Sequence, residues 1–134
     1  MIIPQPLPPF TPVGCWSPDD SILSGIRFRL SEYADARVIY AFAADDTIVY
    51  IGVCDSTTTT LRSRMARYQS RAGAGTNKRI AQRIQRALTA GVNVTIHAWC
   101  PGDGPTIHGI HVDLVKGLEN PLIRALSPEW NIHT

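Results

Sequence analysis

Residues 38–53 read VIYAFAADDTIVYIGV, and this stretch decides the fold. Residues 38–43 and 47–53 are both rich in β-branched and aromatic side chains, which favour strands. Ala44-Asp45-Asp46 between them is typical of a turn, because aspartate side chains hydrogen-bond to nearby backbone groups. The stretch therefore predicts a β-hairpin.

The chain after this hairpin predicts two helices, a third strand and a final helix. Asp55-Ser56-Thr57 offers N-caps to a helix over about residues 59–70, and residues 71–77 predict a loop. Apolar side chains recur every fourth residue in a second helix over about residues 78–90, which Gly91 ends.

Residues 92–99 alternate as a third strand does, residues 101–105 predict a loop, and a last helix covers about residues 113–126. The order β-β-α-α-β-α implies an α/β (α+β) domain, in which a small three-stranded sheet is flanked by helices.

The first 35 residues differ in composition from the rest of the chain. Prolines in residues 1–18 are spaced too closely for a helix or a central strand, so we expect an extended Pro-rich N-terminal arm. Asp19-Asp20-Ser21 could cap a short helix that reaches Leu30, but alternation over residues 26–30 favours a strand almost equally. We therefore expect an arm or extension over residues 1–35 and one domain over residues 36–134.

Composition limits the compartment and the class of protein. A chain of 134 residues is long enough for a single core. No apolar run approaches the roughly 18 residues of a membrane span, and no positive charge precedes the first apolar residues as in a secretory signal. Cys15, Cys54 and Cys100 form neither a disulfide framework nor a zinc site. A cytoplasmic protein without a membrane partner is expected, with Cys54 a small buried residue rather than a nucleophile.

Basic residues are concentrated between residues 62 and 86, although the net charge is only +2. No aspartate or glutamate lies among them, so positive potential gathers on one face and favours a nucleic acid, while a solvated helical face is the alternative interpretation. The residues that we expect to contact nucleic acid are Arg62, Arg67, Arg71, Lys78, Arg79 and Arg83.

Five motifs in order resemble those of the GIY-YIG nuclease superfamily, and the arrangement is particularly similar to the catalytic domain of the bacterial excision-repair incision subunit. The first tripeptide is Val38-Ile39-Tyr40 and the second is Tyr50-Ile51-Gly52. Residues 61–68, LRSRMARY, resemble the helix that carries the family's arginine. The last two motifs are Glu119-Asn120-Pro121-Leu122-Ile123 and Ser127-Pro128-Glu129-Trp130-Asn131. The resemblance covers about residues 36–134.

This resemblance implies a metal-dependent endonuclease that hydrolyses phosphodiester bonds of DNA. It implies that Tyr40 is the general base, Arg64 the catalytic arginine and Glu119 the ligand of one divalent ion, Mg²⁺ or Mn²⁺. Tyr68 stands where the family carries a tyrosine or histidine, and Asn131 where an asparagine closes the site.

The residue chemistry agrees with these roles. Cleavage of a phosphodiester needs an attacking water, an acceptor for its proton and cations around phosphorus. Tyrosine has a pKa of about 10, so it is a poor base unless positive charge favours the phenolate. Arg64 would hold the phosphate through its planar fork of donors, Tyr50 would bind the water or a phosphate oxygen, and Glu119 suits a hard ion.

Two positions depart from the expected pattern. Val38 stands where the family has glycine, which adds a side chain near the site. Pro121 interrupts the last helix two residues after Glu119, so we expect a kink near Gly117 or a helix that begins there, with Glu119 in its first turn.

Alternative interpretations remain at this stage. The chain could be a catalytically inactive nucleic-acid-binding module on the same fold, or a domain whose basic helix contacts an acidic protein. His108 and His111 have metal-ligand spacing but lack a third ligand nearby. The sequence leaves open whether the substrate is DNA or RNA and whether the protein is a monomer or a homodimer. It also leaves open the sequence specificity and the biological role.

Overall fold

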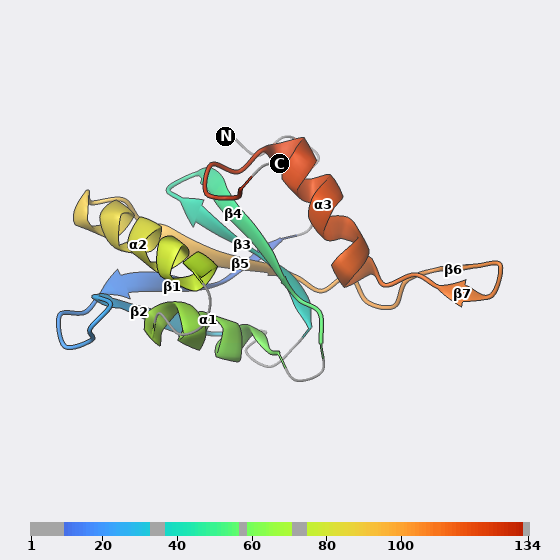
Figure 1. The fold of residues 1–134 in the computed structure, drawn as a ribbon, viewed down its shortest axis with the longest axis horizontal. Coiled ribbons are helices and arrows are strands. Elements are labelled where there is room, and N and C mark those ends of the chain that lie inside the picture. The colour runs from blue at the N-terminus through green and yellow to red at the C-terminus, as the bar shows by residue number, and fades with distance from the viewer. Residues whose placement is uncertain (1–9, 33–36, 57–58, 71–74, 133–134) are drawn as a thin grey trace.

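The computed structural model describes residues 10–32, 37–56, 59–70 and 75–132. Within these residues, one antiparallel sheet has five strands in the order β2-β1-β5-β3-β4 (Figure 1). The mixed α+β class is confirmed, but the expected three-stranded sheet is wrong. The strands are β1 (Thr11–Pro18), β2 (Ile26–Leu30), β3 (Val38–Ala44), β4 (Thr47–Cys54) and β5 (Val94–Trp99).

The predicted hairpin is present as β3 and β4. Asp45 adopts the left-handed conformation in its turn, with φ of 53°. Asp45 is also tied to Asn93, because its carboxylate accepts a hydrogen bond from the Asn93 N–H at 3.2 Å. β3 lies between β4 and β5, and its residues 38–43 are all buried. β3 is therefore a buried inner strand, and β4 forms one edge of the sheet.

Two segments of the expected N-terminal arm, residues 11–18 and 26–30, form strands of the sheet. β1 pairs with β5 on one side and with β2 on the other. Prolines fit into this inner strand because the register shifts between Pro12 and Gly14, and because Pro18 is its last residue. Residues 1–9, which hold the other prolines, lie outside the described residues. The open choice over residues 26–30 is decided in favour of a strand.

The described chain contains three helices, α1 (Leu61–Ser70), α2 (Gly75–Thr89) and α3 (Leu114–Leu126). Thr60, rather than the expected residues 55–57, caps α1: its hydroxyl accepts from the Ser63 N–H at 3.1 Å. α2 begins three residues earlier than predicted and is followed by Gly91 at a φ of 81°. None of these helices is long and apolar enough to cross a membrane.

Apolar side chains pack on both faces of the sheet. One cluster joins the sheet to α1 and α2 and includes Tyr40, Phe42, Met65 and Ile84. The other joins β3 and β4 to α3 through side chains that include Ile39, Ile51, Val115, Leu122 and Leu126. Successive side chains of β3 point to opposite faces of the sheet and belong to different clusters, so this strand contacts the helices on both faces.

α3 begins at Leu114 and continues through Pro121, so the expected start at Gly117 is wrong. Asp113 caps it by accepting a hydrogen bond from the Lys116 N–H at 3.3 Å. Glu119 consequently lies in the second turn of α3 rather than in the first.

A short hairpin that we had not predicted precedes α3. Its strands β6 (Thr106–Ile107) and β7 (Ile110–His111) extend away from the body of the molecule (Figure 1). His108 and Gly109 form its turn at positive φ. In the described part of the chain no group of histidine, cysteine or acidic residues could hold a metal with three ligands.

Candidate active site

A pocket of about 460 Å³ opens where the hairpin, α1, the start of α2 and α3 meet. Its lining combines phenol, guanidinium, carboxylate and amide groups with the backbone of β4. The lining residues are Tyr40, Tyr50, Gly52, Val53, Asp55, Arg64, Arg67, Tyr68, Thr76, Asn77 and Glu119.

Side chains singled out in four separate sequence motifs meet in this pocket. Tyr40 comes from β3, Tyr50 from β4, Arg64 and Tyr68 from α1, and Glu119 from α3. They span 80 positions of sequence, from residue 40 to residue 119. The packing of α1 and α3 against the hairpin therefore assembles the pocket.

The three tyrosine hydroxyls form a chain. The Tyr40 and Tyr68 hydroxyl oxygens lie 2.6 Å apart, and Tyr68 donates to the Tyr50 hydroxyl at 3.5 Å. Burial raises the pKa of Tyr40 well above 10, and the neighbouring Tyr68 and Tyr50 raise it further, while Arg64 acts in the opposite direction. Tyr40 is therefore a neutral phenol in the isolated protein, and it needs more positive charge than Arg64 supplies to become a phenolate.

Arg64 projects from the first turn of α1 and is half-buried. Burial tends to lower the pKa of its guanidinium, but the neighbouring Tyr40, Tyr68, Cys54 and Tyr50 side chains together raise it. Its Nε atom is buried and has no hydrogen-bond partner among the described residues. Arg64 therefore keeps its charge inside the pocket.

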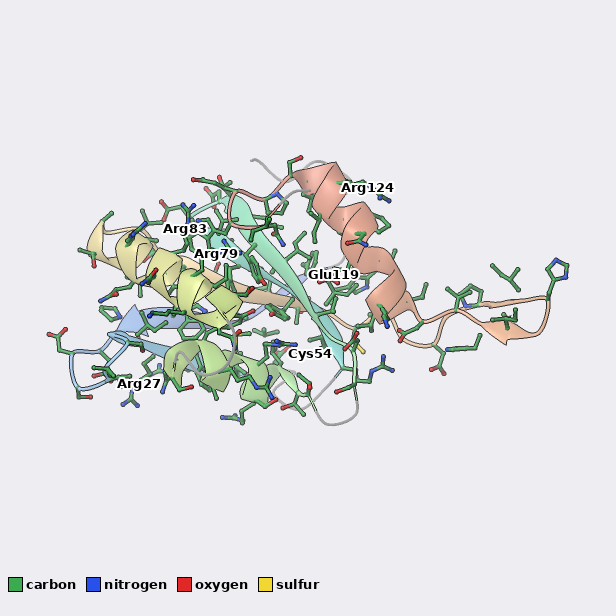
Figure 2. The ribbon with its side chains drawn as sticks, in the orientation of Figure 1. Arg27, Cys54, Arg79, Arg83, Glu119 and Arg124 are labelled. Carbon is green, nitrogen blue, oxygen red and sulfur yellow. The ribbon has the colours of Figure 1, made fainter. Side chains whose placement is uncertain are left out.

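Two carboxyl groups lie near one another in the pocket. Figure 2 shows Glu119 on the side of α3 that faces β4. Burial raises the pKa of Glu119, Asp55 raises it further, and Arg64 opposes both. Asp55, which we expected to cap a helix, instead lines the pocket. Because hard carboxylate oxygens are the donors that Mg²⁺ and Mn²⁺ prefer, Glu119 and Asp55 fit a divalent ion.

Asn131 does not line the pocket. Its side chain makes two hydrogen bonds with the backbone of Ile51, accepting from the N–H at 2.9 Å and donating to the C=O at 3.0 Å. The preceding Trp130 N–H donates to the Val49 C=O at 2.8 Å. Asn131 thus attaches the C-terminal segment to β4 at Ile51, between Tyr50 and Gly52.

The basic residues expected to contact nucleic acid occupy different environments. Arg62, Arg67 and Lys78 are exposed, and Arg67 also lines the pocket. Arg79 is partly buried and donates to the Trp130 carbonyl at 2.7 Å, while Arg83 lies 3.8 Å from a carboxylate oxygen of Glu129. Figure 2 shows both arginines on α2. Arg71 lies outside the described residues.

Solved structures of other proteins resemble this one, among them the following two. The glutamate-to-alanine mutant of EndoII from bacteriophage T4 superposes with a TM-score of 0.67 at 25% sequence identity, over 92% of each chain. This chain is similar in fold to an endonuclease. Restriction endonuclease HPY188I, in complex with product DNA, superposes with a TM-score of 0.55 at 18% identity, over 87% of this chain and 72% of that one. No protein-family model matches the sequence, and neither does any curated protein.

Proposed function

We propose that this protein is a metal-dependent endonuclease of the GIY-YIG type, which hydrolyses phosphodiester bonds of DNA. One observation carries the proposal: Tyr40, Arg64 and Glu119, named by separate motifs, line a single pocket. The similarity in fold to T4 EndoII and to HPY188I, which was solved with product DNA, supports both the activity and the substrate.

Arg64 would bind the scissile phosphate. Its charge lies in a partly desolvated pocket, where an electrostatic contact is stronger than in water. The planar guanidinium presents paired donors that match two phosphate oxygens, so it would also orient the phosphorus for attack. Tyr50 would add a hydroxyl contact to the water or to a phosphate oxygen.

Tyr40 would accept the proton of the attacking water on its Oη atom. Since burial disfavours the phenolate, the base forms only when positive charge is close to the hydroxyl. Tyr68 would stabilise the phenolate, because its hydroxyl lies 2.6 Å away and can turn its proton from Tyr50 to the Tyr40 oxygen. This requirement makes the activity dependent on Arg64 and on a bound cation.

Glu119 would hold the divalent ion, with Asp55 contributing negative charge to the same part of the pocket. When bound, such an ion supplies the positive charge that stabilises the oxygen leaving phosphorus. Outside the pocket, Arg62 and Lys78 would contact neighbouring phosphates of the DNA, since both are exposed.

The test is incubation of the protein with plasmid and with short DNA or RNA duplexes, in Mg²⁺ or in EDTA. Wild type should cut DNA only with the metal. Tyr40→Phe, Arg64→Ala and Glu119→Ala should each lose about 100-fold or more in rate. Glu32→Ala removes an exposed acid and is the matched control. Absence of metal-dependent cleavage on every substrate would refute the proposal, and binding without cleavage would identify an inactive nucleic-acid-binding module instead.

A further inference from the structure

The start of α2 brings an amide into the pocket that the proposed reaction does not use. Asn77 lies in the first turn of this helix and lines the pocket, although its exposed fraction is only 7%. A polar side chain at such a buried position has to be hydrogen-bonded, because an unmatched amide is destabilising there. An amide carries two donor hydrogens and an acceptor oxygen, so a contact within the protein leaves it able to bind a ligand as well.

The cationic and amide groups of the pocket lining come from α1 and α2. Arg64 and Arg67 belong to α1, and Asn77 belongs to α2, whose start lies beside α1 (Figure 1). The carboxyl groups of the lining, Asp55 and Glu119, come instead from the chain after β4 and from α3. The first turn of α2 contains no acidic residue, so nothing there offsets the positive end of the helix dipole. The α1–α2 part of the lining therefore suits an anionic group.

The pocket has room for more of the substrate than the scissile phosphate. Its volume of about 460 Å³ is in the range of pockets that enclose a whole small-molecule ligand. In the proposed reaction Arg64 binds one phosphate. A DNA strand that passes through the pocket would bring the next phosphate of its backbone to the remaining donors, Arg67 and Asn77.

We propose that Asn77 contacts the substrate directly and, together with Arg67, forms a second phosphate subsite for the DNA phosphate next to the scissile one. The inference rests on the proposed function, in which Arg64 binds the scissile phosphate. Asn77 would donate an amide N–H to a phosphate oxygen, and Arg67, which is exposed, would supply positive charge. An uncharged donor suits the buried position, because burying a further cation there would be much more costly.

A purely structural role for Asn77 is the alternative, since asparagine near the start of a helix often bonds to the backbone. The two roles differ in what a substitution changes. A structural contact affects the free energy of unfolding, whereas a substrate contact affects the affinity for a ligand with a second phosphate.

The experiment compares two probes that differ by one phosphate, thymidine 3′,5′-bisphosphate and thymidine 5′-monophosphate, by calorimetric titration in EDTA. Wild type should bind the bisphosphate about 10-fold or more tightly than the monophosphate, as expected for added hydrogen bonds to a charged group. Asn77→Ala should remove most of this preference and leave the affinity for the monophosphate almost unchanged. Arg64→Ala should weaken the binding of both probes.

Gln82→Ala is the matched control, because Gln82 is a partly buried amide of the same helix that does not line the pocket. This variant should keep the wild-type preference for the bisphosphate. Asn77→Asp preserves the shape of the side chain, and its carboxylate should repel the second phosphate, so the preference should disappear. Thermal unfolding without a probe checks that each variant is folded. The inference is overturned if wild type shows no preference, or if a folded Asn77 variant retains it.

A measurement on the wild-type protein does not depend on the folding of variants. In ¹⁵N NMR spectra, the signals of the Asn77 side-chain amide should shift when the bisphosphate is added and shift much less with the monophosphate. Signals that respond to neither probe would refute a direct contact.

Cleavage of DNA gives an independent readout. Asn77→Ala should raise KM by about 10-fold and leave kcat unchanged, because the neighbouring phosphate is bound equally before and during the reaction. A kcat that falls together with the Tm at constant KM would instead indicate a structural role. If wild type cuts no DNA, the proposed function fails, and the probe titrations still decide whether Asn77 binds a phosphate.

Discussion

Gly52 lies directly opposite Tyr40 across the β3–β4 pair, and its missing side chain leaves the space that the phenol ring occupies. A Cβ atom at Gly52 would overlap the Cζ and Oη atoms of Tyr40. Gly52 is not among the residues at positive φ, so the position requires space rather than an unusual backbone conformation. The glycine of the second tripeptide is thus explained by the tyrosine of the first.

Gly52→Ala should therefore displace Tyr40. Because Tyr40 is buried and contacts Tyr68, the ring has little room to move, and overpacking of this kind costs about 1–3 kcal/mol in the free energy of unfolding. The cleavage rate should fall by about 10- to 100-fold, as expected for a displaced catalytic group. Urea unfolding and single-turnover cleavage measure the two effects.

Gly117→Ala is the matched control for that substitution. Nothing lies within 4 Å of a Cβ at Gly117, which is inside α3 and exposed. Alanine there should stabilise the protein by about 0.5–1 kcal/mol and leave cleavage unchanged. Equal behaviour of the two variants would contradict the close approach of Gly52 to Tyr40.

Asn131→Ala should destabilise the protein. The substitution leaves the Ile51 N–H and C=O without their side-chain partner, and each unpaired buried group costs about 1–3 kcal/mol. Cleavage should also decrease, because β4 carries Tyr50 beside this contact. Urea unfolding measures the loss in the free energy of unfolding. The control is Asn120→Ala, at an exposed position of α3, which should change this free energy by less than about 0.5 kcal/mol. Similar losses in both variants would show that Asn131 has no special role.

Arg79→Ala and Lys78→Ala should behave differently, although the residues are adjacent. Arg79 donates to the Trp130 carbonyl, so alanine should cost about 1–3 kcal/mol of stability. Lys78 is exposed, so alanine there should leave stability almost unchanged. Instead it should reduce the slope of DNA affinity against salt by about 1. Fluorescence anisotropy at several salt concentrations measures the effect on DNA affinity, and thermal unfolding measures the effect on stability. An unchanged slope in Lys78→Ala would remove this residue from the DNA interface.

Glu119→Gln should raise stability at neutral pH while abolishing metal-dependent cleavage. The pKa of Glu119 is raised in the folded protein, so folded Glu119 binds its proton more tightly than the unfolded chain does. Wild type therefore loses this stability as the pH rises from about 4.3 through the raised pKa, and the loss is complete above it. Glutamine removes the ionisation, so the Tm of the variant at pH 7 should exceed that of wild type by about 1–3 °C, a small shift because solvent screens the half-exposed carboxylate.

The difference in Tm between wild type and Glu119→Gln, measured from pH 4 to pH 8 by calorimetry, isolates this residue from the other acids. The cleavage rate of wild type should rise over the same pH range in which Glu119 ionises. A Tm difference that shrinks as the pH rises would have the wrong sign and would contradict the burial of Glu119.

Local patterns predicted much of the framework. The alternation and turn residues of 38–53 act over a few positions, so the hairpin, the turn at Asp45 and the end of α2 before Gly91 are confirmed. Most of α1 and α3 were also predicted correctly. The motif resemblance named Tyr40 and Glu119, both of which reach the pocket.

Other features depended on contacts between distant segments. β1 was missed because strand pairing with β5 outweighs the low strand propensity of Pro12, which lies where the register shifts. Asp55 was assigned to a cap that Thr60 provides, and the packing of α3 then brings Glu119 near it. Arg79 was assigned to DNA, but the C-terminal residues return to it and supply an acceptor.

The order of residues was therefore enough to specify the hairpin, most of the helices and the chemical groups available for a reaction, because propensity and periodicity act within one element. Which strands adjoin and which acids share a pocket depended on long-range packing. Burial sets the pKa of Tyr40 and of Glu119, and burial exists only once α1 and α3 have closed on the sheet.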